Sequence, residues 1–204
     1  MKTFLTAIAA FLLTGSAFAQ ATATPEPAEA PRHPKGAIVV GGPLFAADKS
    51  LLPKKAHSSV FNTLGDGKFL VAGLGLLYLS GSKDSARRAG TALVNTGLAT
   101  VALKSLFGRE RPDESDGDTV FRPLRATDAS FPSGHTSASF AVAHSLAQGR
   151  PQNVWLYGLA TMVGVSRVRA RRHFPTDVIA GALLGIGSAE ATRRGGGSLL
   201  FVRL

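Results

Sequence analysis

Segments rich in Ala and Leu recur along the chain, separated by short polar stretches. Val94, Leu98 and Val101 stand at i, i+4 and i+7, the spacing of one face of a helix. No run of alternating β-branched residues is bounded by hairpin turns. The pattern predicts an all-α protein, a single helical bundle with helices over about 57–80, 85–107, 134–148, 152–168 and 176–192.

The two ends of the chain differ from this helical region. Lys2 precedes an apolar run over 4–13, and Ala17-Phe18-Ala19 follows, which is typical of a secretory signal over 1–19; an uncleaved anchor is the alternative. Residues 20–36 are rich in Ala and Pro and predict a linker. The folded domain is expected over 37–194, and a Gly-rich break with a short apolar tail over 195–204 has no assigned function.

The apolar stretches are short for membrane spans. Charge-free segments cover 69–82, 89–103, 151–166 and 178–189, each below the roughly 20 residues that cross a bilayer. This favours a soluble or peripheral bundle. Integral association is kept as the alternative, because Lys and Arg beside Gly- and Ala-rich helices can reach the bilayer surface with their long side chains.

The amino-acid composition limits the kinds of site and partner that the chain can have. The 204 residues carry 23 Lys and Arg against 13 Asp and Glu, a formal net charge of +10, and no Cys. A disulfide scaffold, a thiolate metal site and a cysteine nucleophile are therefore excluded. The basic balance favours an anionic partner: nucleic acid, an anionic lipid surface or a phosphorylated substrate.

Two of the basic residues stand close together near a predicted helix end. Lys104 and Arg111 are seven residues apart, nearly two helical turns, so both long side chains can reach a common anion. Pro112 disfavours helical geometry at Arg111, so we expect the helix to end near Gly108 and Arg111 to turn inward. Taken alone, two cations at a helix end are also typical of dipole compensation.

A second candidate segment is Pro132-Ser133-Gly134-His135, just before an apolar run. It predicts a helix start, where free backbone N–H groups and the helix dipole bind anions. Gly134 lets a ligand approach the backbone, and His135 can donate a proton to a leaving group. An ordinary helix cap with an incidental histidine is the plainer interpretation of this segment alone.

The third segment runs from Ser166 to Asp177. Pro175 prevents one straight helix through His173 and Asp177, so Thr176 or Asp177 can cap the next helix while Asp177 orients the imidazole, which leaves the other ring nitrogen as a nucleophile. Among the neighbouring arginines we expect Arg167 to point inward and Arg169, Arg171 and Arg172 to be mostly solvated. A basic surface patch for nucleic acid or lipid is the alternative.

Together, Lys104-x6-Arg111-Pro112, Pro132-Ser133-Gly134-His135 and Ser166-Arg167-x5-His173-x3-Asp177 resemble the tripartite signature of the type 2 phosphatidic acid phosphatase (PAP2) and vanadium haloperoxidase superfamily. All signature positions are present, in order. The resemblance implies an all-α bundle and metal-independent hydrolysis of phosphomonoesters or pyrophosphates, without a cofactor, through a phosphohistidine. It implies His173 as nucleophile, Asp177 as its orienting carboxylate and His135 as acid. The phosphate-binding residues it implies are Lys104, Arg111, Ser133, Gly134 and Arg167.

Within this family, the small-residue helices and the export signal resemble bacterial lipid phosphatases acting on phosphatidate, isoprenyl pyrophosphate or lipid A. The alternative is a soluble periplasmic acid phosphatase, although the Gly-Ser-Tyr lead-in of that branch is missing before Pro132. A vanadium haloperoxidase ranks third. A non-enzymatic anion- or nucleic-acid-binding module leaves His135, His173 and Asp177 unexplained. An anionic membrane surface is a further expected partner, and nucleic acid is not.

Overall fold

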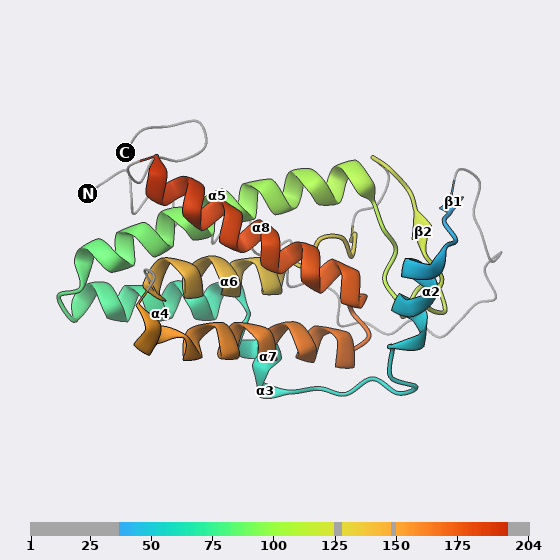
Figure 1. The fold of residues 1–204 in the computed structure, drawn as a ribbon, viewed down its shortest axis with the longest axis horizontal. Coiled ribbons are helices and arrows are strands. Elements are labelled where there is room, and N and C mark those ends of the chain that lie inside the picture. The colour runs from blue at the N-terminus through green and yellow to red at the C-terminus, as the bar shows by residue number, and fades with distance from the viewer. Residues whose placement is uncertain (1–36, 125–127, 148–149, 196–204) are drawn as a thin grey trace.

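The computed structural model describes residues 37–124, 128–147 and 150–195 (Figure 1). The predicted signal, the linker and the C-terminal tail beyond Gly195 lie outside these ranges. In chain order the elements are β1 (Ile38–Val39), α2 (Pro43–Ser50), α3 (Val60–Leu64), α4 (Gly67–Leu79), α5 (Lys83–Phe107), β2 (Val120–Phe121), α6 (Gly134–Ala147), η2 (Pro151–Asn153), α7 (Trp155–Arg169) and α8 (Pro175–Arg194). The all-α bundle is confirmed, with a two-stranded antiparallel sheet of β1 and β2 as a minor addition.

Helix α6 occupies the centre of the bundle and contacts α4, α5, α7 and α8. Its neighbours meet it through small side chains, because Ala92 of α5, Ala141 of α6 and Ala189 of α8 form one buried cluster. A second cluster joins Leu74 of α4 to Leu93 of α5. Small residues at these contacts let the helix axes approach closely, which brings the ends of the helices together.

The prediction of one helix over 57–80 is wrong in its continuity. The chain forms α3 and α4 instead, because Asp66 adopts an extended conformation and its Oδ1 accepts a hydrogen bond from Lys68 N at 2.8 Å. An N-cap of this kind starts a new helix. Gly65 at the break packs so tightly that an added Cβ would stand 2.3 Å from Val163 Cγ1.

Two elements near the N-terminus were not predicted. Helix α2 begins at Pro43, after Gly42 at a φ of 131°, and is too short and too mixed in polarity to give a helical pattern. Strand β1 pairs Ile38 with Phe121 of β2.

The expected end of the long helix is confirmed, since α5 stops at Phe107 and Gly108 takes the left-handed conformation that favours glycine. Among the described helices, none combines the length and apolar character needed to cross a bilayer.

Gly185 of α8 packs directly against the backbone of α6. A Cβ at this position would stand 2.3 Å from Ser137 O and 2.9 Å from Ala141 N, both backbone atoms that cannot rotate away. We expect Gly185→Ala to lower the free energy of unfolding by about 1–3 kcal/mol through overpacking. Gly187→Ala is the matched control: its Cβ meets nothing within 4 Å, so helix propensity alone raises stability by up to about 1 kcal/mol. Denaturant unfolding measures both, and equal shifts would contradict the packing argument.

Candidate active site

Four helix ends meet at one end of the bundle. The C-terminal ends of α5 and α7 and the N-terminal ends of α6 and α8 lie there, beside α2 and the small sheet (Figure 1). Helix N-termini present backbone N–H groups without intrahelical acceptors and carry the positive end of the dipole. The three sequence segments singled out above supply these helix ends, so the fold brings them together.

Lys104 lies in the last turn of α5 and Arg111 in the loop that follows. Lys104 Nζ donates a hydrogen bond to the backbone carbonyl of Ala129. Arg111 Nη1 donates to the carbonyl of Arg172 at 3.3 Å, which ties the loop to the segment before α8. Arg111 is buried, as expected from Pro112 and the helix end at Gly108. Both cations are thus directed inward by backbone carbonyl groups.

Asp128 was not predicted to contact the site. Its carboxylate accepts from Arg111 Nε at 3.0 Å and also contacts Arg111 Nη2, and Arg172 Nη2 lies 3.8 Å away. The Asp128 side chain is about half exposed, in contrast to the buried guanidinium it binds. A carboxylate therefore occupies the anion-binding edge of Arg111 in this structure. Burial raises the pKa of Asp128, but the hydrogen bond and charge of Arg111, followed by the charge of Lys104, outweigh it and lower the pKa.

Arg167 approaches from the last turn of α7, and its Nη1 lies 3.4 Å from Asn62 Oδ1 of α3. Its Nε is buried and has no hydrogen-bond partner among the described residues. Burial, followed by the positive charges of Arg111 and Arg172, lowers the pKa of Arg167 to about 10. Burial and Arg111 likewise lower the pKa of Lys104 to about 8. The three cations are close enough to repel one another, and a bound anion would relieve that repulsion.

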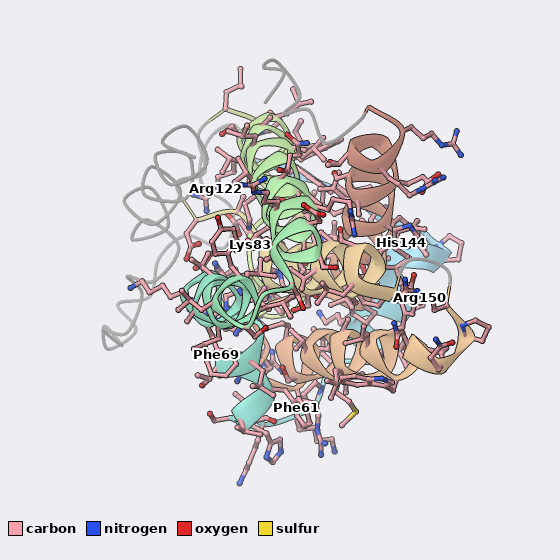
Figure 2. The ribbon with its side chains drawn as sticks, turned by 90° about the vertical axis from the view of Figure 1, so that its left-hand side faces the viewer. Phe61, Phe69, Lys83, Arg122, His144 and Arg150 are labelled. Atoms are coloured by element: carbon pink, nitrogen blue, oxygen red, sulfur yellow. The ribbon has the colours of Figure 1, made fainter. Side chains whose placement is uncertain are left out.

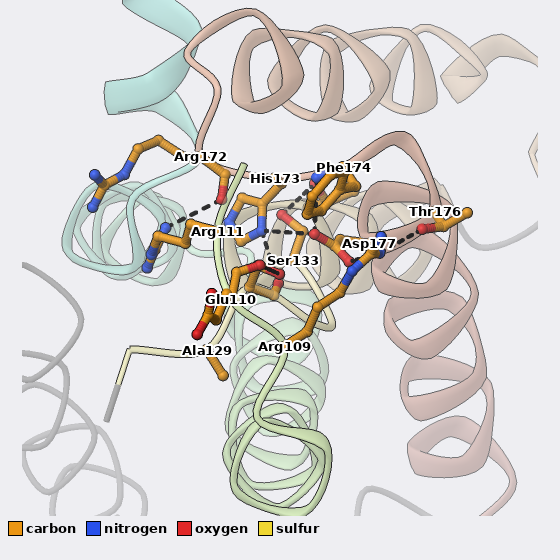
Figure 3. Close-up of polar contacts among 12 residues, drawn as sticks. Arg109, Glu110, Arg111, Ala129, Ser133, Arg172, His173, Phe174, Thr176 and Asp177 are labelled. Carbon is orange, nitrogen blue, oxygen red and sulfur yellow. Dashed lines mark hydrogen bonds and ion pairs between the residues drawn. The ribbon is translucent and has the colours of Figure 1, made fainter. Parts of the chain in front are cut away.

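His173 is almost fully buried, with 2% of its surface exposed, just before α8. Its Nδ1 lies 2.8 Å from the carbonyl oxygen of Ser130, and Figure 3 shows the ring beside Asp177. A carbonyl can only accept, so Nδ1 carries the proton and Nε2 keeps its lone pair in the neutral ring. Burial and the nearby cations Arg111 and Lys104 hold the pKa of His173 well below its usual value. The ring is therefore neutral at pH 7, with Nε2 available as a nucleophile.

Asp177 lies in the first turn of α8, where its Oδ2 accepts from Phe174 N at 2.8 Å and caps the helix, as expected. The same oxygen is 3.7 Å from His173 Nδ1, so the ring donates its direct hydrogen bond to the Ser130 carbonyl and Asp177 acts at longer range. Its Oδ1 pairs with Arg109 Nη1 at 2.7 Å. Burial raises the pKa of Asp177, and the charge of Arg109 opposes this.

His135, Ser133 and Gly134 form the start of α6. Gly134 is the first helical residue, and Ser133 Oγ, fully buried, accepts from Thr136 Oγ1 at 2.9 Å. Burial lowers the pKa of His135 to about 3, with further contributions from Arg167, Arg111 and Lys104. Gly65 packs beside this residue, since an added Cβ there would stand 3.4 Å from His135 Cβ. His135 is thus neutral at pH 7 while no anion is bound.

The other arginines of the third segment differ from expectation in part. Arg169 is exposed as predicted, but Arg171 and Arg172 are half-buried. Arg171 Nη1 donates to the carbonyl of Pro53 at 2.7 Å, and Arg172 Nη1 pairs with Asp113 at 3.0 Å. The loop over 109–130 and the chain before α3 provide partners that the sequence pattern did not reveal. Within the described ranges, no cluster of three or more His, Cys, Asp or Glu side chains is placed to hold a metal ion.

His144 lies away from this region, near the C-terminal end of α6 (Figure 2). Its Nδ1 is 2.7 Å from Tyr157 Oη, and its Nε2 is 3.6 Å from Glu190 Oε2. His57 is exposed in the segment before α3. Neither histidine contacts the cluster around His173, so among the four histidines that the structure describes, His135 and His173 are those of the candidate site.

Comparison with known protein families gives a match that covers the candidate site. A family model described as the PAP2 superfamily matches residues 85–195, more than half of the chain, including all three signature segments. The chain belongs to the PAP2 superfamily. The resemblance identified from the signature is therefore confirmed. The match begins at residue 85, so α2, α3 and α4 precede it.

This PAP2 chain is similar to several characterised relatives. It is 32% identical over 165 residues to a lipid A 1-phosphatase of Rhizobium johnstonii, covering 69% of this chain and 67% of that protein. It is 34% identical over 105 residues to an undecaprenyl-diphosphatase of Sulfolobus acidocaldarius, covering 48% of this chain and about half, 51%, of that protein. Among solved structures, Aquifex aeolicus LpxE has a TM-score of 0.56 at 26% identity, covering 76% of this chain and 88% of that chain.

Proposed function

We propose that this protein is a lipid phosphatase that hydrolyses a phosphomonoester or pyrophosphate through a phosphohistidine, without a metal ion. The observation that carries the proposal is the buried Nε2 of His173, left unprotonated by the Nδ1 contact to Ser130 and set among inward-directed cations. Phosphoryl transfer spreads negative charge over the equatorial oxygens, so several fixed cations and N–H donors are what the transition state requires.

The phosphoryl group would bind between Lys104, Arg111 and Arg167. The unpartnered Nε of Arg167 supports an anion at this place, because a buried N–H donor without an acceptor is costly. The Gly134 N–H at the start of α6 and the Ser133 hydroxyl would hold the remaining oxygens. Asp128 would leave Arg111 as the substrate enters, exchanging one anion for another on the same guanidinium.

The reaction would proceed in two steps. In the first, His173 Nε2 forms a bond to phosphorus while the bond to the leaving oxygen breaks, and that oxygen takes its electron pair and a proton from His135. In the second, a water oxygen attacks phosphorus, the P–N bond breaks and its electrons return to Nε2, while His135 takes the proton of the water. Asp177 favours the positive charge that the imidazole of His173 gains in the first step.

His135 can act as an acid only if the bound substrate changes its charge state. The pKa of His135 is lowered to about 3 by burial and by the cations Arg167 and Arg111. A phosphoryl group bound to these cations neutralises their effect and adds negative charge beside the imidazole, which raises the pKa again. Proton uptake is thereby linked to substrate binding, so His135 is protonated when the leaving group needs a proton.

A lipid substrate is supported by two independent observations. The relatives described above are named for lipid A and undecaprenyl diphosphate. Large apolar side chains are also exposed along α5, α7 and α8, and extended apolar surface of this kind marks a contact with lipid or another apolar partner. They include Leu98, Val101, Leu106, Trp155, Leu159, Met162, Val165, Ile179 and Leu183. Phosphatidate, isoprenyl pyrophosphate and lipid A are the candidate substrates.

We place the enzyme on the exported side of the membrane, in the periplasm, in soluble or peripheral form. The signal-like pattern of Lys2, the apolar run over 4–13 and Ala17-Phe18-Ala19 supports this location. The exposed basic residues Lys54, Lys55 and Arg169 are available for contact with an anionic membrane face. Release of the protein from membranes by a high-salt wash would support peripheral binding, and a requirement for detergent would contradict it.

The function is tested with purified protein on phosphatidate, isoprenyl pyrophosphate, lipid A and a soluble aryl phosphate, with and without detergent. We expect phosphate release, fastest on one of the lipids and unchanged by a chelator. Preference for the aryl phosphate would favour the soluble acid phosphatase, and strict Mg²⁺ dependence would contradict the metal-free mechanism. Salt-sensitive DNA binding without turnover on any substrate would overturn the proposal in favour of a binding module.

A further inference from the structure

Arg109 lies in the loop after α5 and is the largest of the fully buried side chains, with 1% of its surface exposed. Its Nη1 contacts Asp177 Oδ1 at 2.7 Å and its Nη2 contacts Asp48 Oδ2 at 2.8 Å (Figure 3 shows the Asp177 side). Asp48 belongs to α2 and is equally buried. One guanidinium group therefore bridges two buried carboxylates, one from the N-terminal helix and one from the candidate site.

The bridge is completed by hydroxyl and backbone groups. Arg109 Nη1 also donates to Thr176 Oγ1 at 2.7 Å, and Nη2 to Thr119 Oγ1 at 2.9 Å. Asp48 Oδ1 accepts from Thr176 N at 2.9 Å, so a residue of α2 satisfies a free N–H in the first turn of α8. The ring of Phe174 stacks on the guanidinium at 3.8 Å. Asp48 and Arg109 thus fix the segment 174–177 from three sides.

Arg109 also reaches His173 through the backbone. Its carbonyl oxygen accepts from Ser130 N at 2.7 Å, and the carbonyl oxygen of Ser130 contacts His173 Nδ1 at 2.8 Å. The side chain of Arg109 holds Asp177, which lies 3.7 Å from the same Nδ1. Both groups that face the protonated nitrogen of His173 are therefore connected to this one residue.

We propose that Asp48 and Arg109 are positioning residues for His173, and that α2 is consequently part of the catalytic unit although it precedes the family match. The inference rests on the proposed function. Asp48 fixes the guanidinium group of Arg109. That group fixes Asp177 and the backbone contact between Arg109 and Ser130. Asp177 and Ser130 in turn hold the imidazole of His173 with Nε2 directed toward phosphorus. Neither residue contacts the substrate. A displacement of about 1 Å in such a nucleophile can cost about 10²-fold in rate.

Asp48→Asn tests this positioning role. Asparagine keeps the shape and an oxygen acceptor for Thr176 N but removes the charge that holds Arg109. We expect kcat to fall about 10- to 100-fold, while the inhibition constant for inorganic phosphate stays within about twofold, because Lys104, Arg111 and Arg167 are untouched. The matched control is Asp118→Asn, which removes a half-exposed carboxylate paired with Lys49 of α2 at 2.6 Å; both constants should be unchanged.

Each outcome decides the inference. A kcat unchanged in Asp48→Asn, or a phosphate inhibition constant that rises in proportion to the loss of kcat, would overturn it. If thermal unfolding shows that Asp48→Asn does not fold, Thr176→Val replaces it under the same criteria, since it removes the hydroxyl that contacts both Asp48 and Arg109. Wild-type protein that releases no phosphate from any substrate overturns the proposed function itself, which separates that failure from failure of the positioning role.

Discussion

Replacing His173 with asparagine is expected to abolish phosphate release, by a factor on the order of 10⁵ or more, while the protein stays folded and still binds phosphate. The asparagine Nδ2 can take the place of His173 Nδ1 and donate to the Ser130 carbonyl, so the local structure is retained. The nucleophilic Nε2 is lost. Release of inorganic phosphate and thermal unfolding, measured on the same preparation, check both halves of this expectation.

His57→Asn is the control for this variant, because His57 is exposed and lies outside the cluster. Its turnover should equal that of the wild type. Turnover of His173→Asn near the wild-type rate would contradict the assignment of the nucleophile. A rapid alkaline quench can add a direct observation: a phosphoryl group labile to acid and stable to base, as phosphohistidine is, should form on the wild type and be missing from His173→Asn.

Replacing His135 with glutamine is expected to separate the two chemical steps. The lipid alcohol of a phosphomonoester such as phosphatidate leaves as an alkoxide, which needs a proton, so kcat on such a substrate should fall about 10²- to 10⁴-fold. An aryl oxide leaves without a proton, so the first step on an aryl phosphate should remain fast. The second step still lacks a base for water. A burst of one aryl alcohol per enzyme, followed by slow turnover, is therefore expected in stopped-flow measurements.

His144→Gln is the matched control, since it makes the same change in the same helix but next to Tyr157 rather than in the site. It should show no burst and no loss of kcat. Equal losses on lipid and aryl substrates in His135→Gln, without a burst, would mean that His135 only shapes the pocket. The low pKa of His135, about 3, predicts in addition that phosphate binding to the wild type takes up a proton near pH 6, detectable by calorimetry in buffers of different ionisation enthalpy.

Much of the site could be predicted from the sequence because its residues sit at helix ends, which leave strong local signals. Gly108 with Pro112 indicated where α5 stops, and Pro132 with Gly134 indicated where α6 starts. The spacing of His173 and Asp177 around Pro175 indicated the cap of α8. The all-α class followed from the same helical patterns.

The remaining contacts left no such signal. The acceptors for Lys104, Arg111 and His173 are backbone carbonyl groups of Ala129, Arg172 and Ser130, which every residue type has. Asp48 lies in a helix of only eight residues, far along the chain from its partners, and no periodicity marks it. Arg109 stands inside the variable part of the first signature segment. Tertiary packing alone decides that these two side chains meet.

The hydrogen bond from Thr176 to Asp48 joins residues 128 positions apart. Closing so long a loop costs chain entropy before any stabilising contact can offset that cost, which makes such pairings slow to form. The complete site can therefore exist only after α2 has docked onto a bundle whose last helix is already in place. Folding intermediates and fragments limited to the three signature segments would contain every signature side chain. They would still lack the contacts of Asp48 and Arg109 that hold Asp177 and His173 in place. Recovery of activity during refolding should therefore lag behind recovery of helical content.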